Sequence, residues 1–145
     1  MGCKTMEKFV VDANIVISAL IKKGFTFDLI VGLRRAGIKL VSPDFLWEEV
    51  ERKKGKILKY SKLEEKELDF LIRFLSKRIE VVPKEKYEEF IPKAEELLKE
   101  HKKDVPYVAL ALKLGCGIWS NEKRLAELKE VKVFPTHELK KLFLI

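Results

Sequence analysis

The chain has 145 residues, so we expect one domain spanning 1–145, with 1–6 as a loose N-terminal extension. Hydrophobic residues make up 47% of it, enough for a core, but no apolar run approaches the roughly 18 residues of a membrane span, which excludes a membrane partner. The net charge of +7 favours a polyanionic partner or serves solubility alone. The charged fraction of 37%, rich in Lys and Glu, is typical of proteins from thermophiles.

Strand and helix patterns alternate through the first half of the chain. Ser42 as N-cap and Pro43 at the first helical position predict where one helix begins. Ser61 and Glu64 have the spacing of a capping box for the next helix. In chain order we predict a strand over 8–13, a helix over 26–37, a strand over 38–42, a helix over 42–58 and a helix over 61–78.

The second half continues the alternation. Pro92 predicts a bend in its first helix. In chain order we predict a strand over 79–83, helices over 84–101 and 104–115, a strand over 117–120, a helix over 122–128, a strand over 131–135 and a helix over 136–145. This order favours an α/β fold with a parallel sheet of about five strands, covered by helices on both faces.

Acidic side chains recur close to the ends of predicted strands. Asp12 interrupts the most hydrophobic segment of the chain, at the end of the first strand, where the carboxyl edge of a parallel sheet forms binding clefts. The other acids placed in this way are Glu48, Glu49, Asp104 and Glu122. Carboxylates are the ligands that Mg²⁺ and Mn²⁺ prefer, and a metal with a phosphate substrate supports hydrolysis at phosphorus.

Each acid also has a purely structural interpretation. Asp12 fits a hydrogen-bonded structural residue, and Asp104 fits a helix N-cap. Glu48 and Glu49 fit a solvated helix face, and Glu122 fits the positive end of a short helix. The two histidines are isolated and have no metal-ligand spacing. The two cysteines, Cys3 and Cys116, lie far apart and suggest neither a metal site nor a disulfide framework, which agrees with a reducing, cytoplasmic environment.

Three motifs in this order resemble the PIN domain family: VVDANIVISAL at 10–20, SPDFLWEEV at 42–50 and DVPYVALALKLGCGIWSNEKRL at 104–125. The resemblance runs from about Phe9 to Phe134. It implies a small three-layer α/β/α sandwich that acts as a Mg²⁺- or Mn²⁺-dependent ribonuclease on single-stranded RNA. Many members are toxins of toxin–antitoxin pairs, so it also implies an antitoxin partner and a homodimer.

The resemblance also implies the site. Glu49 precedes an aliphatic residue, as the family's second acid usually does, and therefore fits better than Glu48. Glu122 stands where the family usually has Asp, with Ser120 and Asn121 placed to orient water or a carboxylate. The expected catalytic and metal-binding residues are Asp12, with Asn14 as its polar companion, Glu49, Asp104 and Glu122.

Two other functions are considered beside an active nuclease. The Glu at 122 motivates a catalytically silent PIN-like module that binds RNA or protein. A haloacid-dehalogenase-like phosphatase would need Asp where Asn14 stands, and we set it aside. The apolar ending at 142–145 packs on its own core or on a partner. Candidate RNA-backbone contacts near the predicted site are Lys22, Lys23, Lys53, Lys54, Lys56 and Lys59.

Overall fold

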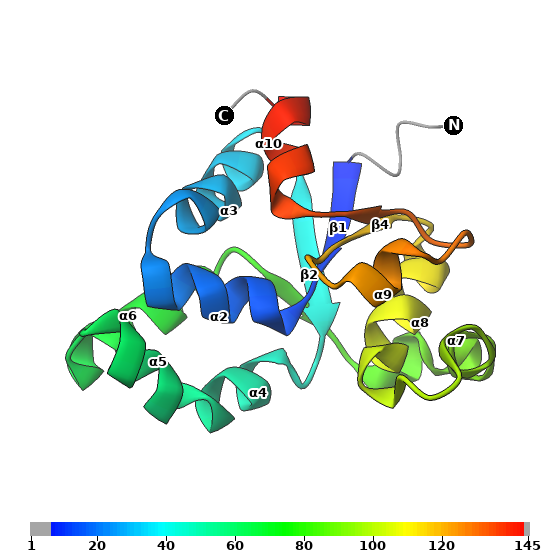
Figure 1. The fold of residues 1–145 in the computed structure, drawn as a ribbon, viewed down its shortest axis with the longest axis horizontal. Coiled ribbons are helices and arrows are strands. Elements are labelled where there is room, and N and C mark those ends of the chain that lie inside the picture. Colours follow the sequence, from blue (N-terminus) through cyan, green and yellow to red (C-terminus); the bar gives the residue numbers. More distant parts are fainter. Residues whose placement is uncertain (1–6, 144–145) are drawn as a thin grey trace.

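A five-stranded parallel sheet forms the centre of the computed structural model, which describes residues 7–143 (Figure 1). The strand order is β3-β2-β1-β4-β5, and all neighbouring strands run parallel. The strands are β1 (Lys8–Val11), β2 (Lys39–Pro43), β3 (Glu80–Val82), β4 (Gly117–Trp119) and β5 (Val133–Phe134). The predicted five-stranded parallel sheet is therefore confirmed.

Helices cover both faces of the sheet, which confirms the three-layer α/β/α sandwich (Figure 1). On one face lie α2 (Ala13–Lys22), α3 (Phe25–Arg35), α4 (Leu46–Arg52), α5 (Lys54–Ser61), α6 (Glu65–Ser76) and α10 (Thr136–Phe143). On the other lie α7 (Ile91–Leu98) and α8 (Val105–Leu114). The short helix α9 (Lys123–Ala126) joins β4 to β5. Within 7–143, no helix is both long enough and apolar enough to cross a membrane.

The helix α2 is an element that the sequence patterns did not predict. It follows β1 after a single residue, Asp12, and most of its apolar residues are buried. Ile15, Val16 and Ile17 are β-branched, which is more typical of strands than of helices. Tertiary burial between the sheet and the helices α3 and α5 therefore overrides local propensity here.

The predicted start of the helix over 42–58 is wrong. Ser42 and Pro43 belong to β2, where the Ser42 hydroxyl donates a hydrogen bond to the Val11 carbonyl at 2.9 Å. The helical segment begins only at α4 and is interrupted at Lys53, before α5 starts. Pairing with β1 and β3 thus extends the strand through residues whose local pattern resembles a helix start.

Two other predicted details also differ. The capping box joins Glu64 to Glu67, three residues later than predicted, and Ser61 instead accepts a hydrogen bond from the Leu63 N–H. The segment 84–101 is no bent helix, because the 3₁₀ turns η1 (Lys84–Lys86) and η2 (Glu88–Phe90) precede α7. Pro92 lies in the first turn of α7, where its missing N–H leaves no helical hydrogen bond unmade.

Of the apolar ending at 142–145, the structure describes Leu142 and Phe143, and only Phe143 packs on the domain's own core. Phe143 contacts Phe9 of β1 edge-to-face, with ring centroids 6.3 Å apart, whereas Leu142 is about half exposed. Leu144, Ile145, Cys3 and the expected extension at 1–6 lie outside the described residues. Cys116 is buried in the core.

The glycine at the start of β4 is required by the ring of β5. A Cβ added at Gly117 would lie 2.6 Å from Cε1 of the buried Phe134 and 3.0 Å from the Lys132 carbonyl. We expect Gly117→Ala to lower the free energy of unfolding by about 1–3 kcal/mol, since neither neighbour can move freely. Urea unfolding followed by circular dichroism measures this.

The matched control is Gly55→Ala in α5, where nothing lies within 4 Å of the added Cβ. That substitution should raise the free energy of unfolding by about 0.5–1 kcal/mol, because Ala is the better helix former. Equal effects of the two substitutions would contradict the packing argument.

Candidate active site

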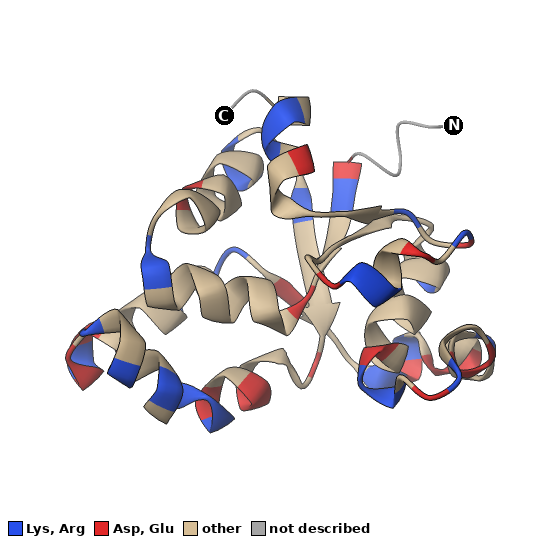
Figure 2. Ribbon diagram, viewed as in Figure 1, with Lys and Arg blue, Asp and Glu red and all other residues tan. Residues whose placement is uncertain are grey.

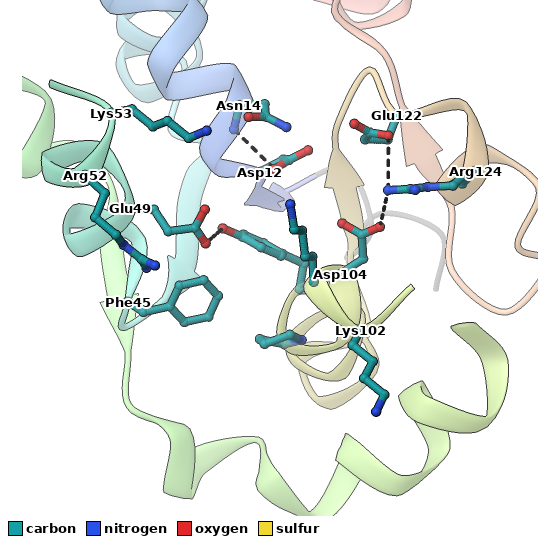
Figure 3. Close-up of a pocket in the computed structure, with 13 residues that line it drawn as sticks. Asp12, Asn14, Phe45, Glu49, Arg52, Lys53, Lys102, Asp104, Glu122 and Arg124 are labelled. Atoms are coloured by element: carbon teal, nitrogen blue, oxygen red, sulfur yellow. Dashed lines mark hydrogen bonds and ion pairs between the residues drawn. The ribbon is translucent and has the colours of Figure 1, made fainter. Parts of the chain in front are cut away.

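A pocket of about 780 Å³ opens near the carboxyl ends of β1, β2 and β4 (Figure 3). β1 is the central strand from which the chain first builds outward to β2 and later to β4 on the other side. This is the switch point at which open parallel sheets form ligand sites. The pocket contains all four acids expected at the site: Asp12, Glu49, Asp104 and Glu122.

Asp12 is the most constrained of these carboxylates. It is only 6% exposed, and it caps α2 by accepting a hydrogen bond from the Asn14 N–H at 3.2 Å. Its second oxygen accepts a hydrogen bond from the Ser120 hydroxyl at 2.8 Å. Burial raises the pKa of Asp12 to about 6, with smaller contributions from the charges of Asp104 and Glu122. Asp12 therefore has a structural role and also lies at the pocket.

Glu49, on α4, enters the pocket, and its exposed neighbour Glu48 does not line it. The Tyr107 hydroxyl donates a hydrogen bond to Glu49 Oε1 at 3.4 Å (Figure 3). Burial, together with the nearby charges of Glu49 and Asp12, raises the pKa of Tyr107 far above its usual range. The phenol therefore stays protonated at neutral pH and remains a donor to Glu49.

Asp104 lies where the turn η3 (Lys102–Asp104) meets α8, and it is 6% exposed. Its side chain makes no cap hydrogen bond to the helix, so the N-cap interpretation is wrong for the side chain. It accepts a hydrogen bond from Arg124 Nη2 at 3.3 Å instead. Burial raises the pKa of Asp104, and the Arg124 charge partly opposes this rise.

Glu122 and Ser120 connect the fourth acid to the first. The Glu122 N–H donates to the Ser120 hydroxyl oxygen at 3.1 Å, and that hydroxyl in turn donates to Asp12. Ser120 therefore orients a carboxylate, as the sequence indicated. The Asn121 side chain instead accepts a hydrogen bond from the backbone N–H of Thr136 at 2.8 Å. The Glu122 carboxylate lies 3.6 Å from Arg124 Nη2.

The donors suit a hard divalent cation in their chemistry, since all four are carboxylates, and the buried pair Asp12 and Asp104 have pKa values raised mainly by burial. They are not gathered into a ready-made cluster, however. Within residues 7–143, no three His, Cys, Asp or Glu side chains are arranged to hold a metal ion. Glu49 and Glu122 are both only partly buried, whereas Asp12 and Asp104 are buried.

The basic residues at the pocket differ from those expected. Of the predicted lysines only Lys53 lines it, and Lys54 forms an ion pair with Asp69 at 2.7 Å and another with Glu65 at 3.3 Å. The charged residues of α5 are all lysines, whereas α6 carries both acidic and basic residues (Figure 2). The cations that line the pocket are Arg52, Lys53, Lys102, Lys103 and Arg124. The pair Lys102–Lys103 directly precedes Asp104, and this adjacency is a sequence signal that could have identified them.

A family model described as PIN domain matches residues 10–138. The chain belongs to the PIN domain family. The match includes all four acids of the pocket, as well as Asn14 and Ser120. The family resemblance of the three sequence motifs is therefore confirmed, and it places the protein among nuclease-type domains.

The fold of this PIN domain also occurs in a solved complex. One chain in the crystal structure of VapBC2 from Rickettsia felis, bound to a DNA fragment from their promoter, superimposes with a TM-score of 0.65. The alignment covers 88% of this chain and 98% of that chain, at 15% sequence identity. At this identity the similarity establishes the fold. No curated protein matches the sequence significantly.

The buried Asp12 carboxylate generates a prediction about stability. Its pKa is about 6 in the folded protein, against 3.8 in the unfolded chain. Because the folded pKa is the higher one, the contribution of Asp12 to stability is fully present below pH 3.8 and is lost as pH rises through 6. With a chelator present, we expect Asp12→Asn to raise the free energy of unfolding at pH 7.5 by about 1–3 kcal/mol, and to have little effect at pH 3.5.

Urea unfolding at both pH values provides the measurement. Glu48→Gln is the matched control, since it removes an exposed acid beside the pocket without lining it. A pH-independent gain in Asp12→Asn, or a loss at pH 7.5, would show that burial of this charge does not limit stability.

Proposed function

We propose that this PIN domain protein is a metal-dependent endoribonuclease that hydrolyses phosphodiester bonds of single-stranded RNA. One observation carries the proposal: four distant segments of the chain bring Asp12, Glu49, Asp104 and Glu122 to a single pocket. The same pocket is bordered by five cations, so an acidic centre has a basic surround. That arrangement suits a metal ion at the centre and a polyanion across the rim.

The proposed ligands of Mg²⁺ or Mn²⁺ are the same four carboxylates. A bound cation supplies Lewis acidity for attack of water on phosphorus and neutralises charge on the leaving oxygen. Asp12 is held for this role by Ser120 and by the first turn of α2, so its position does not depend on the ligand. Tyr107 similarly restrains Glu49 through its hydroxyl.

The basic residues are proposed to hold the RNA backbone on either side of the scissile phosphate. Arg52 and Lys53 come from the end of α4, whereas Lys102 and Lys103 come from η3, so the two pairs reach the pocket from different segments. Phe45 also lines the pocket and is only partly buried, so it offers an aromatic surface for an unpaired base. Unpaired bases favour single-stranded RNA as the substrate.

We further propose that the chain is the toxin of a toxin–antitoxin pair, acting in the cytoplasm, with an antitoxin protein and a second copy of itself as partners. The family resemblance and the fold likeness to a chain of VapBC2 support this. Exposed aromatic side chains on the helices α5 and α6, Tyr60 and Phe70, are available for such contacts.

A second candidate function is a catalytically silent module that binds RNA or protein. Two observations favour it. Glu122 stands in place of the family's usual Asp. The described carboxylates also form no ready-made metal cluster. Calorimetric titration separates the candidates, because a silent module would bind no Mn²⁺ at millimolar concentration.

Cleavage of an unstructured RNA in Mg²⁺ or Mn²⁺ tests the nuclease proposal. We expect Asp12→Asn and Glu49→Gln each to lower kcat/KM by about 10²-fold or more, since each removes a proposed metal ligand. Glu48→Gln is the matched control, because it removes the adjacent acid that lies outside the pocket, and it should retain activity. Cleavage that is equal in all three variants, or absent from the wild type, would refute the proposal.

Salt dependence tests the proposed RNA path. We expect the double substitution Lys102→Gln with Lys103→Gln to reduce the slope of log K against log salt by about 0.7 for each phosphate that no longer meets a lysine. Fluorescence anisotropy of a labelled oligouridine on the Asp12→Asn background measures binding without cleavage. The control is Lys22→Gln with Lys23→Gln, since these lysines do not line the pocket, and it should leave the slope unchanged.

A further inference from the structure

Arg124 differs from the other cations of the pocket in its contacts. Its Nη2 atom lies 3.3 Å from Asp104 Oδ2 and 3.6 Å from Glu122 Oε2, so one guanidinium connects two of the four acids (Figure 3). Arg52, Lys53, Lys102 and Lys103 line the same pocket, and none of them forms an ion pair with an acid in the described part of the chain.

The guanidinium contacts two carboxylates that a divalent cation at this site would also need. Asp104 is almost fully buried, and one of its two carboxylate oxygens, Oδ2, is already bound to Arg124. A metal ion coordinated by Asp104 would be repelled by a positive guanidinium at hydrogen-bond distance from the same carboxylate. A divalent cation at Asp104 would therefore have to compete with Arg124.

The Arg124 side chain also has space beside it into which it could move away from Asp104. Its side chain is 47% exposed and rises from α9, a helix of only four residues. It lines a second cavity, of about 560 Å³, next to the first. Glu100 and Glu127 line this second cavity, so a displaced guanidinium can find another carboxylate there.

We infer that Arg124 is the resident counterion of the site: it holds Asp104 and Glu122 while no divalent cation is bound, and it releases Asp104 when one binds. Arg124 is thus a positioning residue that keeps the carboxylates paired, and it weakens metal binding by having to be displaced. This rests on the proposed function, because it takes the four acids to be metal ligands.

Calorimetric titration of chelator-treated protein with MnCl₂ tests the inference. We expect Arg124→Gln to tighten Mn²⁺ binding on the order of tenfold, the factor that corresponds to one charge-assisted hydrogen bond. Arg52→Gln is the matched control, since it removes the same charge from the same pocket without breaking an ion pair, and it should change the dissociation constant by less than about threefold.

Arg124→Lys provides a second variant that keeps the charge. Lys lacks the planar fork of Arg, so we expect a dissociation constant between those of wild type and Arg124→Gln. A structural role alone cannot account for a gain in affinity, because damage to the site would weaken metal binding.

The other outcomes separate the inference from the proposed function. If the wild type binds Mn²⁺ and Arg124→Gln binds it equally or more weakly, competition is overturned and the nuclease proposal stands. If Arg124→Gln and Arg52→Gln tighten binding equally, the effect is one of net charge, and the inference is overturned. If neither the wild type nor Arg124→Gln binds Mn²⁺ at millimolar concentration, both are overturned.

Discussion

A negative charge buried at the end of the central strand is the constraint around which this domain is arranged. Asp12 lies between the largely buried strand β1 and the mainly apolar helix α2, where an ionised carboxylate is costly. Two hydrogen bonds offset part of that cost, one from the first turn of α2 and one from Ser120 after β4. The Ser120 hydroxyl reaches Asp12 only because β1 is paired with β4.

The same constraint organises the rest of the pocket. β1 pairs with β2 on one side and β4 on the other, so the segments that follow all three strands lie at one edge of the sheet. The first turn of α8 and its preceding residue bring Tyr107 and Asp104 to this edge from the opposite helical layer. Acids that repel one another without a counterion are thus held in one place, and Arg124 supplies the positive charge that pairs with two of them in the described structure.

Stability and the proposed chemistry oppose one another at this site. Burial raises the pKa of Asp12, and the neighbouring acids Asp104 and Glu122 raise it further. The same crowding of carboxylates is what suits a divalent cation. A domain selected for stability alone would place a neutral side chain there. A cost of this kind at a pocket is characteristic of functional sites.

The sequence by itself determined the order of the strands, and its three motifs indicated the family. It also identified four acids that lie at one pocket, because strand ends in a parallel sheet meet at one edge whatever the helices do. It did not determine α2, whose β-branched residues favour a strand until the surrounding helices bury them, or the start of α4, which strand pairing delays past Ser42 and Pro43. The motif already favoured Glu49 over Glu48, and the pocket contains Glu49. Only the tertiary structure decided that Arg124, and none of the predicted lysines, forms an ion pair with the acids of the pocket. Local patterns indicate which side chains of a helix share a face, but the partner that this face meets comes from a distant segment of the chain, so only the fold determines it.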